Sequence, residues 1–191
     1  MLNLILFGPP GAGKGTQAAK LGEAYRLMHV STGDILRNEI ARSTPLGVKV
    51  KSIIDRGELV SDEILIEILE SVIENNRKVN GFIFDGFPRT IPQADALDRM
   101  LSERGERIAA VISLEVDDEE LIRRLLNRAI ELGRSDDTEE VIRKRQEIYA
   151  RQTKPLLDHY RPTGLLHEIF GMGTIREIFG KLTAVIEPLL R

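Results

Sequence analysis

The sequence contains no cysteine and no tryptophan, and only 5% of its 191 residues are aromatic. Without cysteine the chain forms no disulfide, no thiolate zinc site and no cysteine nucleophile. It also lacks any apolar run that approaches the roughly 18 residues of a membrane-spanning helix. The chain opens into a strand pattern instead of a leader, and we therefore expect a cytoplasmic protein with no membrane partner.

Positive charge is not in excess either. With 27 lysine and arginine residues against 30 aspartate and glutamate residues, the formal net charge is −3. This balance argues against a protein that binds nucleic acid through its overall charge. A content of 42% hydrophobic and 30% charged residues is typical of a globular domain. The length suits one domain with small insertions, and an anionic ligand would have to be bound by locally arranged cations.

A glycine-rich stretch follows the first predicted strand, residues 2–7, and leads into a helix predicted over residues 14–25. It reads Gly8-Pro9-Pro10-Gly11-Ala12-Gly13-Lys14-Gly15-Thr16. Glycines allow backbone N–H groups to close around an anion, and the N-terminus of the following helix attracts negative charge. The phosphate-binding pattern G-x-x-x-x-G-K-[ST] is met up to Lys14, but Gly15 follows and the hydroxyl comes one residue later, at Thr16. A phosphate-binding loop is predicted, the alternative being an ordinary glycine-rich turn.

Apolar strands and amphipathic helices alternate along the chain. Further strands are predicted over residues 28–30, 81–85, 109–114 and 165–170, and further helices over about 61–75, 93–104, 117–128, 138–160 and 174–190. The segment 31–60 is polar and is predicted to form short helices with loops. Strands that are apolar throughout indicate a parallel sheet covered on both faces, so the predicted fold class is doubly wound α/β.

Ligands of parallel sheets bind at the carboxyl ends of the strands, where three polar stretches of this sequence lie. They are the glycine-rich stretch, residues 31–34 and residues 85–89. Asp85 is predicted to act on a magnesium ion, which proteins usually hold through one or two carboxylates and substrate phosphates. Capping of the next turn is the alternative role for Asp85. Arg89 is predicted to bind phosphate, the alternative being a solvated surface arginine.

Arginines are dense between residues 123 and 151. Arg128 and Arg134 flank a predicted excursion at Gly133, and they suit phosphate oxygens because the guanidinium is planar and permanently charged. Of the other arginines in this stretch, we assign solvated helix faces to four, Arg123, Arg124, Arg143 and Arg151. The histidines lie in no motif, and we expect surface or structural roles for His29, His159 and His167.

Four motifs occur in order along the chain. They are Gly8 to Gln17, Ser31-Thr32-Gly33-Asp34-Ile35-Leu36-Arg37, Phe84-Asp85-Gly86-Phe87-Pro88-Arg89-Thr90 and Gly133-Arg134-Ser135-Asp136-Asp137. Together they resemble the adenylate kinases, a family whose phosphate loop carries glycine between lysine and threonine. The resemblance implies a P-loop NTPase-like, doubly wound parallel sheet of five strands with two mobile excursions. It places a monophosphate-binding segment at residues 31–60, a lid at 127–137, and the core at 1–30, 61–126 and 138–191. The lid is short and free of cysteine, so no zinc is expected.

The same resemblance assigns residues to a reaction, the reversible transfer of a phosphoryl group from Mg-ATP to AMP that gives two ADP. ATP would be bound by Gly11, Ala12, Gly13, Lys14, Gly15, Thr16, Arg128 and Gly173. AMP would be bound by Thr32, Arg37, Glu58, Leu59, Val60, Gly86, Phe87, Pro88, Arg89, Gln93, Arg134 and Arg145. The catalytic cations would be Lys14, Arg89, Arg128, Arg134 and Arg145. Asp85 would lie near Mg²⁺ carried with ATP, and Asp136 and Asp137 would order the closed lid.

Thr90 and Gln93 favour AMP as the acceptor, because pyrimidine-monophosphate kinases of this fold typically carry asparagine after the arginine. A UMP/CMP kinase and a nucleotide-binding module without turnover stay as alternatives. Ala129 and Gln146 depart from the usual short-lid sequence at positions that bear on lid packing. No general base is expected, since the attacking AMP oxygen is already ionised near neutral pH, and the expected protein is a monomer.

Overall fold

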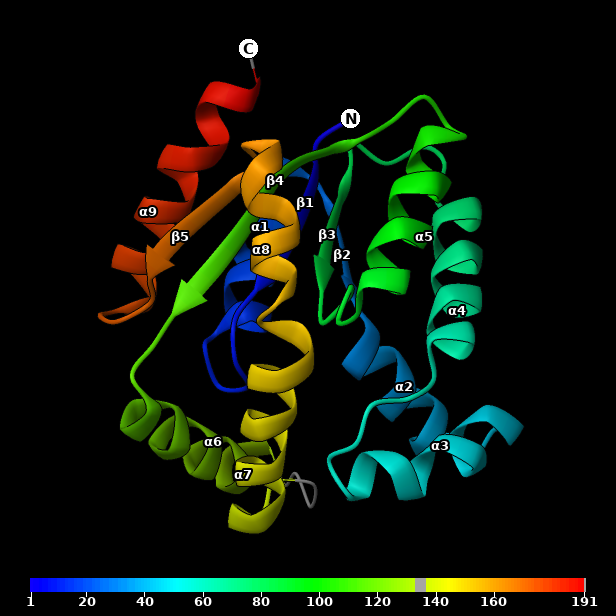
Figure 1. Cartoon of the computed structure of the whole chain (residues 1–191), viewed down its shortest axis with the longest axis vertical. Coiled ribbons are helices and arrows are strands. Elements are labelled where there is room, and N and C mark those ends of the chain that lie inside the picture. The colour runs from blue at the N-terminus through cyan, green and yellow to red at the C-terminus, as the bar shows by residue number, and fades with distance from the viewer. Residues whose placement is uncertain (133–136, 191) are drawn as a thin grey trace.

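The computed structural model describes residues 1–132 and 137–190, in which five strands form one parallel sheet. The strands are β1 (Asn3–Phe7), β2 (Met28–Ser31), β3 (Phe82–Asp85), β4 (Ile108–Glu115) and β5 (Leu166–Phe170). They pair in the order β2-β3-β1-β4-β5, so the first strand lies at the centre (Figure 1). The predicted five-stranded parallel sheet is confirmed, and each apolar run of the sequence became one strand.

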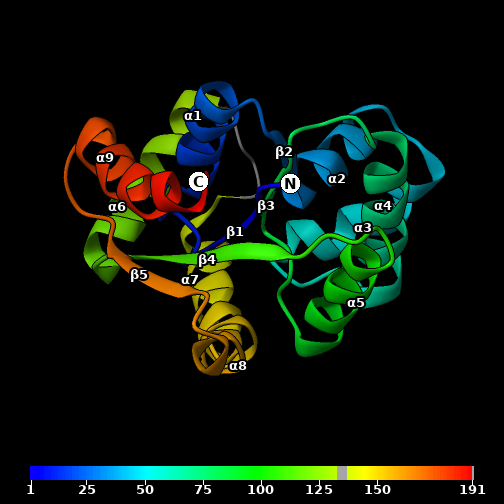
Figure 2. The same cartoon turned by 90° about the horizontal axis from the view of Figure 1, so that it is seen from above.

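Helices cover both faces of the sheet (Figure 2). One face carries α1 (Lys14–Tyr25) and α9 (Ile175–Ile186), and the other carries α4 (Asp62–Asn75), α5 (Ile91–Ser102) and α8 (Leu156–Tyr160). Successive side chains of a strand point to opposite faces. In β1, Leu4 and Leu6 therefore pack in the core beneath α1 and α9, while Ile5 and Phe7 pack in the core on the opposite face.

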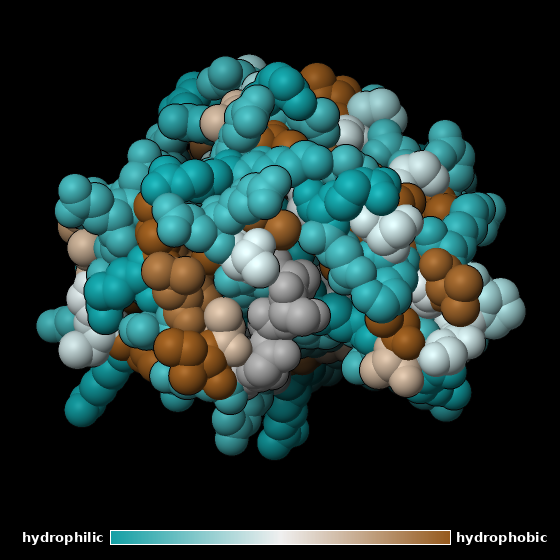
Figure 3. All heavy atoms as spheres, turned by 90° about the horizontal axis from the view of Figure 1, so that it is seen from below, coloured by the Kyte–Doolittle hydropathy of each residue, from teal (hydrophilic) through white to brown (hydrophobic). Residues whose placement is uncertain are grey.

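Helices also project beyond the carboxyl ends of the strands (Figure 1). The segment 31–60 forms α2 (Thr32–Ala41) and α3 (Pro45–Asp55) as predicted, and α6 (Asp118–Leu132) and α7 (Glu139–Ile148) lie on the other side. The Ser31 hydroxyl accepts a hydrogen bond from the Asp34 N–H and thereby caps α2. Figure 3 looks onto this end, where hydrophilic side chains dominate and a hydrophobic area lies on the side of α6.

The start of α5 and the end of α6 differ from the sequence prediction. Helix α5 begins at Ile91, ahead of the predicted start, because the Thr90 side chain caps it and Pro92 occupies the first turn, where no backbone N–H is required. Helix α6 continues beyond Arg128 to Leu132 through residues 129–132, which are good helix formers. Within residues 1–132 and 137–190, no helix combines the length and the apolar character that crossing a membrane demands.

The prediction of a single helix over residues 138–160 is wrong. The structure instead divides this segment into α7, a π-helical turn (Tyr149–Thr153) and the short α8. Pro155 explains the break, because proline has no N–H for the helical hydrogen bond and its ring clashes with the preceding turn. The last predicted helix likewise ends early, at Ile186, and a 3₁₀ turn covers Glu187–Leu190.

Candidate active site

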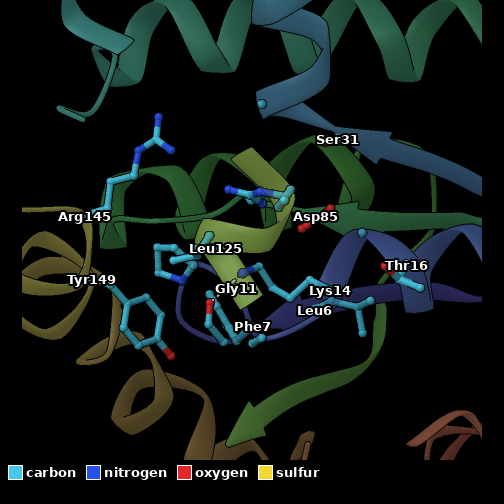
Figure 4. A pocket seen from close by; sticks show the side chains of 18 of the residues that line it. Leu6, Phe7, Gly11, Lys14, Thr16, Ser31, Asp85, Leu125, Arg145 and Tyr149 are labelled. Atoms are coloured by element: carbon cyan, nitrogen blue, oxygen red, sulfur yellow. Dashed lines mark hydrogen bonds between the residues drawn. The ribbon is translucent and has the colours of Figure 1, made fainter. Parts of the chain in front are cut away.

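A cavity of about 890 Å³ opens at the carboxyl ends of the strands. Its walls are the glycine-rich loop, the start of α2, the turn that precedes α4, the end of β3, and the facing sides of α6 and α7. Figure 4 shows Lys14, Asp85 and Arg145 directed toward this space from three different elements. The three polar stretches that the sequence analysis placed at strand ends therefore converge on one cavity.

The glycine-rich loop packs closely against α6. Gly11 has a φ of +87°, and a Cβ on it would lie 2.9 Å from Cγ of Leu125 and 3.0 Å from the carbonyl oxygen of Leu121. Only glycine meets both demands without displacement. At the start of α1, no side chain of the described residues caps the helix at Gly13. The first N–H groups of α1 are therefore uncapped and belong to residues that line the cavity, an arrangement that suits an anion.

Lys14 lies at the centre of the loop. Its Nζ donates to the carbonyl oxygens of Gly8 at 2.7 Å and Pro9 at 3.0 Å. Burial lowers the pKa of Lys14 to about 8, against the raising effect of the Asp85 carboxylate and with further lowering by the charges of Arg89 and Arg128. A bound phosphate would reverse this shift, because it would supply the negative charge that the buried ammonium lacks.

Asp85 ends β3 in register with Leu6 and Ser31 of the neighbouring strands. Its Oδ2 would lie 3.4 Å from a Cβ built on Gly15, so the carboxylate faces the loop. The same Oδ2 lies 3.4 Å from Nε2 of His29, a contact that the sequence analysis missed because His29 belongs to a strand and to no motif.

The donor atoms around Asp85 fit magnesium better than a metal that needs an all-protein cage. Among the described residues no three His, Asp or Glu side chains converge into a possible metal site. Magnesium is usually held by one or two carboxylates, with substrate phosphates and waters completing its shell. A carboxylate beside a phosphate-binding loop matches that preference.

Thr32 and Arg89 are joined through the end of β3. The Thr32 hydroxyl and Nε of Arg89 both donate to the carbonyl oxygen of Gly86, at 2.9 Å and 2.8 Å. Burial lowers the pKa of Arg89, opposed by the Asp85 carboxylate and reinforced by other guanidinium groups. The rest of this wall carries several of the predicted residues, namely Arg37, Glu58, Leu59, Val60, Gly86 and Pro88.

Two of the residues predicted to bind AMP, Phe87 and Gln93, do not line the cavity. Phe87 is buried in the core that α4 and α5 cover. The Gln93 side chain is fully buried, and its Nε2 donates to Asp62 at 2.7 Å while its Oε1 accepts from the backbone N–H of Arg89 at 2.7 Å. Both lie directly behind residues that do line the cavity.

On the opposite wall, Asp137 joins two arginines. Its side chain has no exposed surface and accepts from Nε and Nη2 of Arg128 at 2.7 and 2.9 Å, and from Nη1 of Arg145 at 2.9 Å. Both guanidinium groups therefore reach the cavity from a shared carboxylate. The predicted residues Gly133, Arg134 and Asp136 lie outside the described residues.

A profile described as "Adenylate kinase" matches residues 6–165. The chain belongs to the adenylate kinase family. It is 48% identical over 189 residues to the adenylate kinase of Phocaeicola vulgatus, with 99% of this chain and 100% of that protein covered. It is 47% identical over 183 residues to the adenylate kinase of Thermus thermophilus, with 96% of each covered, and 50% identical over 185 residues to that of a Caulobacter species, with 97% and 98% covered.

Family membership sets the reaction. The chain is a nucleotide-binding transferase that converts ATP and AMP to two ADP. This sets aside both alternatives that the sequence motifs left open, the UMP/CMP kinase and the module without turnover.

The cavity of this adenylate kinase contains residues that the sequence analysis missed. Arg124 was predicted to be solvated, which is wrong: its side chain is only 22% exposed, donates to Glu120 and to the carbonyl oxygen of Gly171, and lines the cavity. Arg124 precedes Arg128 by one helical turn, a spacing that would have placed both on one face of α6. Tyr149 also lines the cavity, and burial with the nearby Glu115 charge raises its pKa to about 12.

Proposed function

We propose that the cavity holds both nucleotides at once, with Mg-ATP against the loop and AMP against the 31–60 segment. The observation that carries this proposal is the convergence of Lys14, Arg89 and Arg145 on one cavity from three separate parts of the chain. Phosphoryl transfer spreads negative charge over the oxygens of the moving group, and catalysis rests largely on cations arranged around it. A cavity walled by such cations supports direct transfer between two bound phosphates.

In this proposal the ATP phosphates bind the backbone N–H groups of residues 11–16 and the Lys14 ammonium. Arg128 contacts ATP from α6, and Arg124 joins it because it lines the same wall. Gly173 contacts the base through its backbone, which is supported by its place at the rim of the cavity ahead of α9.

AMP binds the opposite wall through Thr32, Arg37, the backbone of residues 58–60, Gly86, Pro88 and Arg89. Arg145 lies between the two sites and contacts the transferred group, with Arg134 in the same role. Phe87 supports the wall from behind. Gln93 keeps its bonds to Asp62 and to the Arg89 N–H and pairs with the adenine edge through its second amide hydrogen and its second oxygen lone pair, once the residues that cover its amide separate.

Magnesium, carried in with ATP, neutralises phosphate charge when bound, and Asp85 would hold its outer shell. The chain's own residues supply positioning and charge, and no side chain needs to remove a proton. The 31–60 segment and the lid at 127–137 close over the cavity, because water admitted beside ATP would be phosphorylated in place of AMP. Closure of both is therefore part of the proposed mechanism.

We propose that the active protein is a monomer, as the resemblance to the family implies. The cytoplasmic location and the absence of a nucleic-acid partner stay predictions of the sequence.

The test is steady-state ADP production by Lys14→Ala and Arg89→Ala with Mg-ATP and AMP, CMP or UMP as acceptor. We expect both variants to lose at least about 100-fold in kcat, since each removes charge stabilisation of the transition state. Arg143→Ala is the matched control, because Arg143 is 64% exposed and pairs only with Glu139 of its own helix among the described residues. Near-normal rates in both site variants would show that the assignment of the cavity is wrong.

A further inference from the structure

Asp62 is the first residue of α4, at the point where the 31–60 segment returns to the core. Its Oδ1 accepts from Nε2 of Gln93 at 2.7 Å, and its Oδ2 accepts from the Thr90 hydroxyl at 2.9 Å. Thr90 and Gln93 are the N-cap and an early residue of α5. One carboxylate therefore ties the start of α4 to the start of α5, and the proposed mechanism assigns it no role.

The two partners of Gln93 fix the orientation of its amide. A carboxylate only accepts hydrogen bonds and a backbone N–H only donates them. Nε2 must therefore face Asp62, and Oε1 must face the Arg89 N–H at 2.7 Å. Because the Gln93 side chain is fully buried, water cannot replace either bond if it is lost.

Arg89 is held at three points. Its N–H bonds Gln93, its carbonyl oxygen accepts from the Thr153 hydroxyl at 3.3 Å, and its Nε donates to the carbonyl oxygen of Gly86 at 2.8 Å. The guanidinium borders the cavity. The backbone anchor that Gln93 supplies is thus one of the contacts that decide where this guanidinium lies.

We propose that Asp62 is a positioning residue: through the Gln93 amide it fixes the backbone of Arg89 and so the placement of the guanidinium at the acceptor phosphate. The proposal rests on the proposed function of Arg89 as a phosphate ligand. Asp62 itself contacts no substrate. Its influence passes through two hydrogen bonds, and its loss should lower the rate of phosphoryl transfer because displacement of a reacting group by about 1 Å can cost about 100-fold.

Three single variants test this with kcat measured at saturating AMP, so that placement of Arg89 is read separately from AMP affinity. Asp62→Ala removes the acceptor, and we expect kcat to fall at least about tenfold. Asp62→Asn keeps an oxygen for Gln93 and offers its amide to the adaptable Thr90 hydroxyl, so kcat should stay within about threefold of the parent. Glu63→Ala is the matched control, since it removes the neighbouring, exposed acid from the same helix turn.

A swap of the two groups makes the test sharper. Gln93→Glu places two carboxylates against each other, so kcat should fall and should recover in part as the pH is lowered, because paired carboxylates share a proton. Combining Gln93→Glu with Asp62→Asn restores complementarity: the introduced amide donates to the introduced carboxylate, which still accepts from the Arg89 N–H. We expect kcat to return toward that of Asp62→Asn even if KM for AMP does not.

The outcomes separate cleanly. If Asp62→Ala lowers the melting temperature but leaves kcat unchanged, Asp62 is structural and the proposal is overturned. The proposal is also overturned if the double variant Gln93→Glu with Asp62→Asn regains the melting temperature of the parent but not its kcat. If Asp62→Ala does not fold, the double variant alone tests the proposal. Near-normal kcat in Arg89→Ala would instead overturn the proposed function. If Arg89→Ala loses kcat while Asp62→Ala keeps a normal kcat, the positioning role of Asp62 is overturned and the proposed function of Arg89 stands.

Discussion

The ammonium of Lys144 lies 2.9 Å from the carboxylate of Glu58, and this ion pair joins the 31–60 segment to α7. Hydrogen bonds from Arg56 and Lys144 hold the pKa of Glu58 down to about 2. Beside it, Gly57 has a φ of +70°, and a Cβ there would lie 3.0 Å from Cγ1 of Val141. The 31–60 segment thus meets α7 in a close contact that carries charge.

We expect Lys144→Gln to raise KM for AMP by up to about fivefold, because an exposed ion pair contributes modestly to holding the segment against α7. Raising the salt concentration should raise KM of the parent enzyme and should have less effect on the variant, since screening weakens the same pair. Lys51→Gln is the control, because Lys51 pairs with Asp55 inside α3 and bridges no two segments among the residues that the structure describes. Equal salt dependence of parent and variant would contradict this expectation.

Lys14 makes ATP binding pH-dependent. Its pKa of about 8 lies below the usual range, so the free enzyme loses the Lys14 proton as the pH rises through 8. Phosphate binding favours the protonated ammonium. The affinity for ATP is therefore expected to be highest below pH 8, where Lys14 is already protonated, and to decline as the pH rises above 8. Calorimetry of ATP binding at pH 8, in buffers of different ionisation enthalpy, should show uptake of a fraction of a proton. The Lys14→Met variant should show none, and uptake of the same size in that variant would assign it to another group.

Asp137 accepts hydrogen bonds from two guanidinium groups, so Asp137→Ala should destabilise the nucleotide-free protein. Breaking a buried pair costs about 3 kcal/mol or more, and since Arg128 is 31% exposed we expect about 2 kcal/mol. That corresponds to a melting temperature lower by about 4–8 °C. Saturating ATP should reduce the difference in melting temperature between the parent and Asp137→Ala, because the ATP phosphates replace the carboxylate as partner of the guanidinium groups. Asp55→Ala, which removes an exposed acid within α3, should leave the melting temperature nearly unchanged.

Gln17 is a site where stability can be gained. Its Nε2 donates to the carbonyl oxygen of Ile175 at 3.0 Å, but its buried Oε1 has no hydrogen-bond partner among the described residues. Gln17→Met removes the unpaired oxygen, and the Ile175 carbonyl still accepts within α9. We expect a net gain of about 1 kcal/mol, seen as a melting temperature higher by about 2–4 °C. A lower melting temperature in Gln17→Met would mean that Oε1 is satisfied by water, and Gln17→Glu should destabilise in either case.

The strands and the site edge could be predicted because they depend on local signals. Short apolar runs such as residues 2–7 and 81–85 indicate buried strands of a parallel sheet. Because ligands of such a sheet bind at the carboxyl ends of its strands, Lys14, Thr32 and Asp85 could be predicted to lie at one site, and all three line the cavity. The glycines and the lysine of residues 8–16 were enough to predict the phosphate-binding loop from the sequence.

The remaining features depend on packing between distant segments. Whether Arg124 meets solvent or the cavity depends on how α6 crosses the loop, and the contact of His29 with Asp85 depends on two strands being neighbours. Burial of Gln93 follows from Asp62, which lies 31 positions earlier in the chain. The broken helix is different, since Pro155 was a local signal, and it outweighs the helical pattern of the charged residues around it.

The π-helical turn Tyr149–Thr153 has a consequence for chain length. Such a turn accommodates one residue more than an α-helical turn. The five residues 149–153 therefore cover about the rotation that four α-helical residues would cover. A deletion of one residue here would restore α-helical winding with little rotation of the downstream segment, whereas one residue inserted ahead of Thr153 would rotate it by about 100°. After such an insertion the Thr153 hydroxyl would leave the Arg89 carbonyl oxygen, which it contacts at 3.3 Å. In this stretch a one-residue deletion is therefore expected to lower activity less than a one-residue insertion.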